Sequence, residues 1–141
     1  SYLRERTIWS VLAETLRNVT EPRSQLIEFA KKNLIPVLGV CRGMQMILHR
    51  FGVKLEPVNS HVTPRHRIRV YGDPIEVNSY HRFAAFETCS ALKPWAFAED
   101  GAIEAVRSVD EKLVGVMWHP ERTTPFAARD IALFRDVFGV E

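Results

Sequence analysis

A cysteine flanked by glycines, Gly39-Val40-Cys41-Arg42-Gly43, is the feature of this sequence that most restricts its fold. It follows the short apolar run IPVLGV (35–40) and precedes MQMILHRF (44–51), whose apolar spacing predicts a helix that ends at Gly52. A nucleophile between two such glycines, with a buried strand before it and a helix after it, is the pattern of a nucleophile elbow. The pattern predicts a tight, strained turn in which side chains at positions 39 and 43 would clash with the neighbouring strand and helix.

Cys41 would be the nucleophile of this turn. An elbow directs the sulfur toward solvent above the sheet and holds the thiolate near a helix N-terminus, whose partial positive charge stabilises the anion. The backbone N–H of Arg42 would then face the oxyanion that forms on the substrate. The same residues are also compatible with a small buried cysteine between two turn glycines, so a catalytic role requires a base elsewhere in the chain.

His119 is the histidine best placed to be that base. It follows the apolar run LVGVMW (113–118) and precedes Pro120 and Glu121. Open α/β sheets bind their ligands at the carboxyl ends of strands. In an extended chain, residues two apart share a face, so Glu121 could accept a hydrogen bond from the imidazole and fix its tautomer. On its own, such a pair is more commonly a loop histidine beside a surface glutamate.

His49, His61, His66 and the second cysteine predict no further site. His49 falls in a predicted helix, and His61 and His66 fall in a polar, basic loop for which we expect no catalytic role. Cys41 and Cys89 lack the C-x-x-C or H-x-x-x-H spacing of zinc ligands, so we expect neither a metal nor a cofactor. Both are expected to be free thiols in a reducing cytoplasm, because a domain of this size rarely needs a disulfide.

The order of the predicted elements indicates one α/β domain over residues 1–141. A net charge of +2 is too small to indicate a nucleic-acid partner, and no apolar run approaches the about 18 residues that span a membrane. The apolar run at 35–40 fits a strand that is buried on both faces of a parallel sheet. Helices are predicted at 5–17, 22–33, 44–51 and 126–138, and strands at 35–40, 66–70, 75–78, 94–98, 102–106 and 113–118, with a turn at 71–74.

Three segments resemble those of a known family. PVLGVCRGMQ (36–45) is similar to the nucleophile segment of class I glutamine amidotransferases and γ-glutamyl hydrolases. VNSYHR (77–82) resembles their substrate-side segment, and GVMWHPE (115–121) resembles their His-x-Glu end. The segments occur in the family's order, and the resemblance covers roughly residues 22–138.

The resemblance implies a fold and a chemistry. The fold would be a flavodoxin-like three-layer sandwich with a mostly parallel central sheet. Cys41, His119 and Glu121 would form a catalytic triad that hydrolyses a γ-glutamyl amide through a γ-glutamyl thioester. Gln45 would help to hold the glutamyl group, and Arg42 would donate its backbone N–H. The segment from Asn78 through Ser79 and Tyr80 to His81 would line the substrate pocket, mainly through backbone groups and Ser79.

The chain departs from the family pattern before the nucleophile. The family has a glycine-rich loop there, which supplies a second oxyanion donor, whereas this chain has no glycine before Gly39 and no convincing strand in residues 1–33. We therefore expect these residues to be the C-terminal part of a longer domain, without its first strands.

Three functions fit this resemblance. VNSYH (77–81) resembles the stand-alone hydrolases more than the synthetase-coupled enzymes, which favours hydrolysis of a small γ-glutamyl compound. A glutaminase that passes ammonia to a synthetase partner is the first alternative, and a catalytically inactive regulatory or binding relative is the second. The segment HVTPRHRIR (61–69) could meet an anionic part of the substrate, although a solvated basic strand face is the commoner role of such a segment.

Overall fold

The computed structural model describes residues 20–109 and 112–139, so the helix predicted at 5–17 lies outside the described residues. Among the described helices, none is long and apolar enough to cross a membrane. The elements are α2 (Thr20–Lys32), β1 (Val37–Val40), α3 (Arg42–Arg50), β2 (Glu56–Pro57), β3 (Val62–Val70), β4 (Asp73–Tyr80), β5 (Phe83–Ala84), β6 (Leu92–Ala98), β7 (Ile103–Ser108), β8 (Leu113–Val116), the 3-10 helix η2 (Pro120–Arg122) and α4 (Ala128–Phe138). The remaining predicted helices and strands are confirmed, with shifted ends, while β2, β5 and η2 were not predicted.

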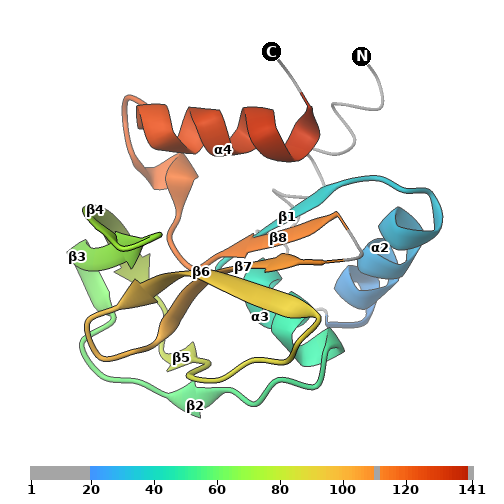
Figure 1. Cartoon of the computed structure of the whole chain (residues 1–141), viewed down its shortest axis with the longest axis horizontal. Helices are drawn as coiled ribbons and strands as arrows, with labels where there is room; N and C mark the ends of the chain where they lie inside the picture. The colour runs from blue at the N-terminus through green and yellow to red at the C-terminus, as the bar shows by residue number, and fades with distance from the viewer. Residues whose placement is uncertain (1–19, 110–111, 140–141) are drawn as a thin grey trace.

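The main sheet has the strand order β1-β8-β7-β6-β3-β4, and β2 pairs with β5 in a separate two-stranded sheet. The α/β class is confirmed, and α4 lies on one face of the β1–β8 pair while α3 lies on the other, with α2 beside α3 (Figure 1). The sheet of the described residues is mixed rather than mostly parallel. Only β1 and β8 run parallel, and the other described pairs are antiparallel.

The β1–β8 pair lies at the centre of the core because both strands are apolar throughout. All four residues of each strand are buried, as expected for parallel strands that are covered on both faces. Helix α3 packs on the pair through Met44, Ile47 and Leu48, whose i, i+3, i+4 spacing forms one buried stripe. The strand ends that carry the candidate catalytic residues are therefore fixed by the best-packed part of the molecule.

Two glycines let α3 approach the strand backbones. Gly39 and Gly115 are register partners in β1 and β8. A Cβ on Gly39 would lie 2.6–2.8 Å from backbone atoms of Gly43 and Met44, and a Cβ on Gly115 would lie 2.8 Å from the Met44 side chain. The steric prediction is therefore confirmed for Gly39. It is wrong for Gly43, whose Cβ would meet no atom within 4 Å, because position 43 on the first turn of α3 faces away from the strands.

Candidate active site

Cys41 occupies a sharp turn between β1 and α3. Its backbone has φ 51° and ψ −97°, a region that non-glycine residues seldom adopt and that stores strain. Its N–H donates to the carbonyl of Val116 in β8 (2.7 Å), and its carbonyl accepts the first helical hydrogen bond from Gln45 (3.0 Å). Strand pairing on one side and helix start on the other thus fix the residue in this conformation.

The sulfur is less accessible than the sequence predicts. Cys41 is only 6% exposed and belongs to the buried apolar cluster, whereas the elbow pattern predicted a thiol directed at solvent. Cys41 lies between β1 and α3, which approach each other closely at Gly39. A substrate would meet a nucleophile that is largely shielded from water.

His119 follows β8 at the same edge of the sheet at which Cys41 follows β1. The two strands are parallel and in register, with Val40 opposite Val116, so their carboxyl ends lie side by side. Cys41 is one residue beyond its strand, and His119 is three residues beyond Val116. A thiol and an imidazole therefore leave adjacent strand ends, the usual ligand-binding edge of an α/β sheet.

Glu121 orients the His119 ring. The Nδ1 of His119 lies 2.6 Å from Oε1 of Glu121, so Nδ1–H donates to the carboxylate and a neutral ring has its lone pair at Nε2. Burial pushes the pKa of Glu121 upward, but the hydrogen bonds with His119 and with its own backbone N–H, together with the charges of His119 and Arg122, outweigh burial and lower that pKa below its usual value. The carboxylate is ionised at neutral pH and can stabilise an imidazolium.

Asn78 holds the backbone of His119 from β4, the edge strand at the far end of the main sheet. The His119 N–H donates to Oδ1 of Asn78 (2.7 Å), and Nδ2 of Asn78 donates to the His119 carbonyl (2.8 Å). The ring of Tyr80 contacts the His119 ring edge-on at 5.8 Å between centroids, and the Arg122 guanidinium lies 4.7 Å from the Tyr80 ring centre. Asn78 and Tyr80 share one face of the strand, and that face meets His119.

Ser79 and His81 contact a different part of the molecule. Both are buried, and the hydroxyl of Ser79 donates to the backbone carbonyl of His61 rather than toward His119. The His81 ring lies beside His61 and Glu104. Because side chains alternate along an extended chain, residues 79 and 81 point away from the face that carries Asn78. The prediction that the Ser79 hydroxyl lines the substrate pocket therefore finds no support in its contacts.

The two predicted helix residues differ in their surroundings. Gln45 donates through Nε2 to the carbonyl of Phe83 (3.3 Å), which ties the start of α3 to β5. Arg42 has an exposed side chain, and its backbone N–H belongs to the first turn of α3. Sequence reasoning missed Asp130, a buried residue of α4 that accepts a hydrogen bond from the indole N–H of Trp118 (3.0 Å). Its signal in the sequence is an acid three residues before the apolar pair Leu133-Phe134 in a predicted helix.

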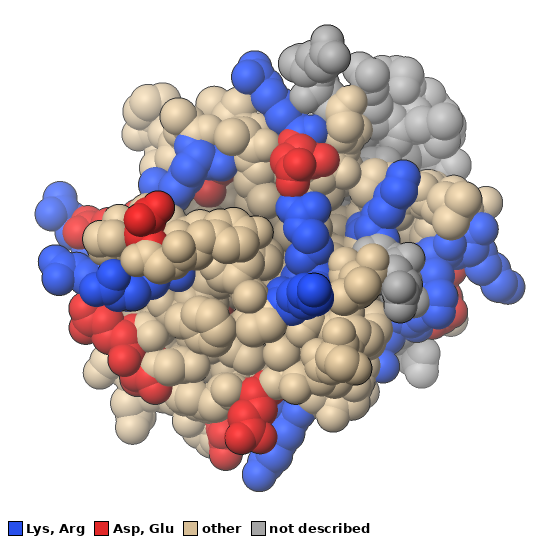
Figure 2. Space-filling model, in the orientation of Figure 1, with Lys and Arg blue, Asp and Glu red and all other residues tan. Residues whose placement is uncertain are grey.

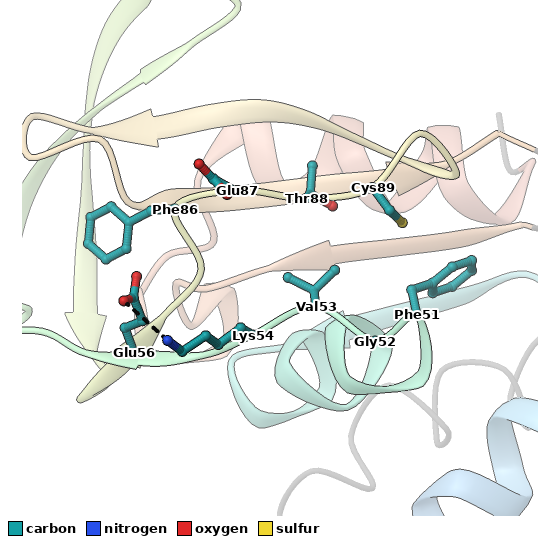
Figure 3. Close-up of a pocket in the computed structure, with 9 residues that line it drawn as sticks. All are labelled: Phe51, Gly52, Val53, Lys54, Glu56, Phe86, Glu87, Thr88 and Cys89. Carbon is teal, nitrogen blue, oxygen red and sulfur yellow. Dashed lines mark ion pairs between the residues drawn. The ribbon is translucent and has the colours of Figure 1, made fainter.

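Cys89 offers a contrast to Cys41. The two cysteines, both in the described part of the chain, form no disulfide, as predicted. Cys89 lines a pocket between the segment after α3 and the segment at 86–89 (Figure 3). Its lining comprises Phe51, Gly52, Val53, Lys54, Glu56, Phe86, Glu87, Thr88 and Cys89, and contains no imidazole. A thiol without a neighbouring base lacks the activation that a cysteine nucleophile needs.

The basic segment at 61–69 forms an exposed strand face. Arg65, Arg67 and Arg69 alternate with His66 and Ile68 along β3 and are exposed. Arg65 lies 3.6 Å from Glu76, and Arg69 donates to the carbonyl of Gly72 (3.0 Å), so both interact within the β3–β4 hairpin. Basic and acidic side chains are interspersed on the face shown in Figure 2. These contacts favour a solvated strand face over an anion-binding site.

Asn78→Ala is expected to lower the free energy of unfolding by about 1–3 kcal/mol, because the part-buried N–H and carbonyl of His119 lose their side-chain partners. Urea unfolding followed by circular dichroism measures the change. Asn59, which is exposed, is the matched control, and Asn59→Ala should stay within about 0.5 kcal/mol of wild type. Equal losses in the two variants would contradict the bridging role of Asn78.

The chain is similar to known proteins in sequence and in fold. The family model described as glutamine amidotransferase class-I matches residues 15–136. A gamma-glutamyl-CDP-amidate hydrolase from Campylobacter jejuni is 37% identical over 98 residues, which cover 70% of this chain and 48% of that protein. Anthranilate synthase component 2 from Archaeoglobus fulgidus is 35% identical over 103 residues, covering 67% of this chain and 57% of that protein.

A solved structure shares the fold. The crystal structure of a glutamine amidotransferase from Thermotoga maritima superposes with a TM-score of 0.63 at 23% identity, covering 82% of this chain and 54% of that one. At this identity the likeness shows the fold alone. The chain spans about half the length of the curated relatives that it matches first.

Proposed function

Because the chain belongs to the class I glutamine amidotransferase family, we propose that it carries the catalytic residues of an enzyme that hydrolyses a γ-glutamyl amide bond. Cys41 is the nucleophile, His119 the general acid and base, and Glu121 the residue that orients His119. The observation that carries this proposal is the pairing of β1 with β8, because it brings the strand ends that precede Cys41 and His119 to one edge of the sheet. The 2.6 Å contact between His119 and Glu121 supports the role of Glu121 as the residue that orients the imidazole.

In the first step His119 takes the proton of the Cys41 thiol through Nε2, and the thiolate attacks the γ-carbonyl carbon of the substrate. The C–N bond then breaks, and the leaving amine or ammonia receives that proton from His119. In the second step His119 removes a proton from water, the hydroxide attacks the γ-glutamyl thioester, and the C–S bond breaks. Glutamate is released, and the sulfur regains its proton from His119.

The strain at Cys41 fits this role. A positive φ at a residue with a side chain is kept only where the surroundings enforce it. At Cys41 the backbone hydrogen bond to Val116 and the first hydrogen bond of α3 enforce it. The backbone N–H of Arg42 would donate to the oxyanion, since donors at a helix start are fixed before the reaction begins. Gln45, Asn78 and Tyr80 would contribute to the glutamyl pocket. A reducing cytoplasm would keep Cys41 as a thiol.

Two candidate functions share this chemistry and differ in their substrate. The similarity to a protein named gamma-glutamyl-CDP-amidate hydrolase favours a stand-alone hydrolase that acts on a small γ-glutamyl compound. The similarity to a protein named anthranilate synthase component 2 favours the second candidate, a glutaminase that delivers ammonia to a synthetase partner. Both use the same chemistry at Cys41 and differ in the amine that leaves.

A direct test follows the thioester. The protein is incubated with glutamine and, separately, with a set of γ-glutamyl amides, and glutamate release is measured. Rapid acid quenching followed by peptide mass spectrometry should locate a γ-glutamyl adduct on Cys41. Release from γ-glutamyl amides without any partner supports the hydrolase, while glutamine hydrolysis that rises when a synthetase is added supports the second candidate. No release and no adduct with any substrate would contradict both and favour an inactive binding relative.

Replacing Glu121 with glutamine should change the pH dependence of stability. Glu121 has a pKa below 4.5 in the folded chain, so its ionised form is favoured by folding. That contribution is complete above about pH 4.5 and is lost as the pH falls through the lowered folded value. Since glutamine does not titrate, the stability difference between wild type and Glu121→Gln should shrink as the pH falls below this value. Urea unfolding from pH 7 to pH 3 measures it, and a difference that grows on acidification would contradict the assignment.

A further inference from the structure

Three histidines converge on one buried carboxylate, on the side of residues 78–81 that faces away from His119. The carboxylate belongs to Glu104 in β7, which is 1% exposed. His61 and His81 are buried as well, and His66 is nearly so. The proposed reaction uses none of these four residues, and burying them has a cost that requires an explanation.

The distances within this cluster are those of a metal site. Oε1 of Glu104 lies 3.2 Å from Nδ1 of His61, 3.3 Å from Nε2 of His66 and 3.3 Å from Nε2 of His81. Nδ1 of His61 and Nε2 of His81 are also 3.3 Å apart. A tetrahedral zinc with bonds of about 2.0–2.1 Å separates its ligand atoms by about 3.3–3.4 Å, so these four distances match four of the six edges of such a tetrahedron. The ligand atoms of His61, His66 and Glu104 all lie within 4.8 Å of one another.

Hydrogen bonds alone account poorly for the cluster. Nδ1 of His81 lies 3.1 Å from the carbonyl of Phe83 and donates to it, so a neutral His81 turns the lone pair of Nε2 toward Oε1 of Glu104, which is also an acceptor. In addition, Oε2 of Glu104 is buried and has no hydrogen-bond partner among the described residues. A cation between Oε1 of Glu104 and Nε2 of His81 would remove this repulsion.

The outer contacts also match those around metal ligands. Metal-bound histidines usually donate their second N–H to a carboxylate or a backbone carbonyl. His61 has Nε2 at 2.6 Å from Oδ2 of Asp100, whose other oxygen accepts the N–H of Ala102 at 3.0 Å. His81 makes the corresponding bond to Phe83. These partners direct Nδ1 of His61 and Nε2 of His81 toward Glu104.

We propose that His61, His66, His81 and Glu104 form a binding site for a divalent transition-metal cation, with zinc as the preferred ion. Three imidazoles and one carboxylate suit zinc, whereas calcium and magnesium prefer oxygen ligands. The expectation of no metal rested on the spacing of the cysteines, and neither cysteine belongs to this cluster. A bound cation would cross-link β7 to the open end of the β3–β4 hairpin, where His61 and His81 lie, and to His66 within β3. The opposite face of the hairpin carries Asn78.

Metal analysis by mass spectrometry tests the site, independently of any enzymatic activity. The protein as purified should contain about one zinc per chain, and removal by a chelator should lower the melting temperature, which added zinc chloride restores. Asp100→Asn should weaken zinc binding about 10- to 100-fold through the lost outer contact, and His66→Asn should weaken it further. His49→Asn, in an exposed position on α3, is the matched control and should bind as wild type does.

Cobalt chloride provides a second readout on wild-type protein, should a variant fail to fold. Tetrahedral cobalt gives intense visible absorption bands. Bands that rise with added cobalt and level off at about one cobalt per chain would support the site. Zinc well below one per chain, with a melting temperature that neither chelator nor zinc changes, would overturn the proposal. Such a result would leave the cluster as a hydrogen-bonded network, and it would not affect the thioester test at Cys41.

Discussion

Cys41→Ala is expected to lower glutamate release by a factor of about 10⁴ or more, because no other group can form the covalent intermediate and attack falls to unactivated water. Alanine keeps a Cβ at a position with φ 51°, so the backbone strain is the same in the variant and in wild type. We therefore expect an unchanged fold and retained binding of the substrate. Steady-state kinetics measure the loss in rate, and isothermal titration with substrate measures binding.

Cys89→Ala is the matched control for this experiment. Its thiol is half-buried in a pocket whose lining contains no histidine, so its removal should leave glutamate release unchanged. Loss of activity in both variants would indicate a general effect of removing thiols. Full activity in Cys41→Ala would refute the nucleophile, and with it the mechanism.

Gly39→Ala should have the largest effect on stability, a loss of about 3 kcal/mol. The added methyl group would lie 2.6–2.8 Å from the carbonyl group of Gly43 and the backbone nitrogen of Met44. Backbone atoms cannot move aside by changing a rotamer, so α3 would have to lift from β1 and displace Cys41, which connects the two. Urea unfolding measures the loss in stability, and glutamate release should fall with it.

Gly43→Ala tests whether this cost belongs to one glycine or to both. The methyl group would meet no atom within 4 Å, and position 43 is helical, where alanine is favoured over glycine by up to about 1 kcal/mol. We expect unchanged or slightly increased stability. If Gly43→Ala were as damaging as Gly39→Ala, the close approach of α3 to β1 would not explain the requirement for glycine.

Local patterns in the sequence were sufficient for the centre of the fold. The apolar runs at 35–40 and 113–118 predicted β1 and β8, because strands that are buried on both faces need apolar residues throughout. The spacing of 44–51 predicted α3, because its buried stripe repeats every three or four residues. The contact between His119 and Glu121 was also predicted, but on the assumption of an extended chain, whereas Glu121 lies in the 3-10 helix η2. Each of these predictions depends on neighbours in the sequence.

Local sequence patterns therefore specify the elbow, the strand ends and the residue types that they carry. The tertiary structure decided which face each side chain occupies: it placed Asn78 against His119 and Ser79 against His61, although both are polar neighbours in one strand. It also made the sheet mixed, buried Cys41, and joined His61 to Glu104 across 43 positions of the sequence. The physical reason is that strand pairing and packing bring together residues whose separation in the sequence gives no sign of their contact.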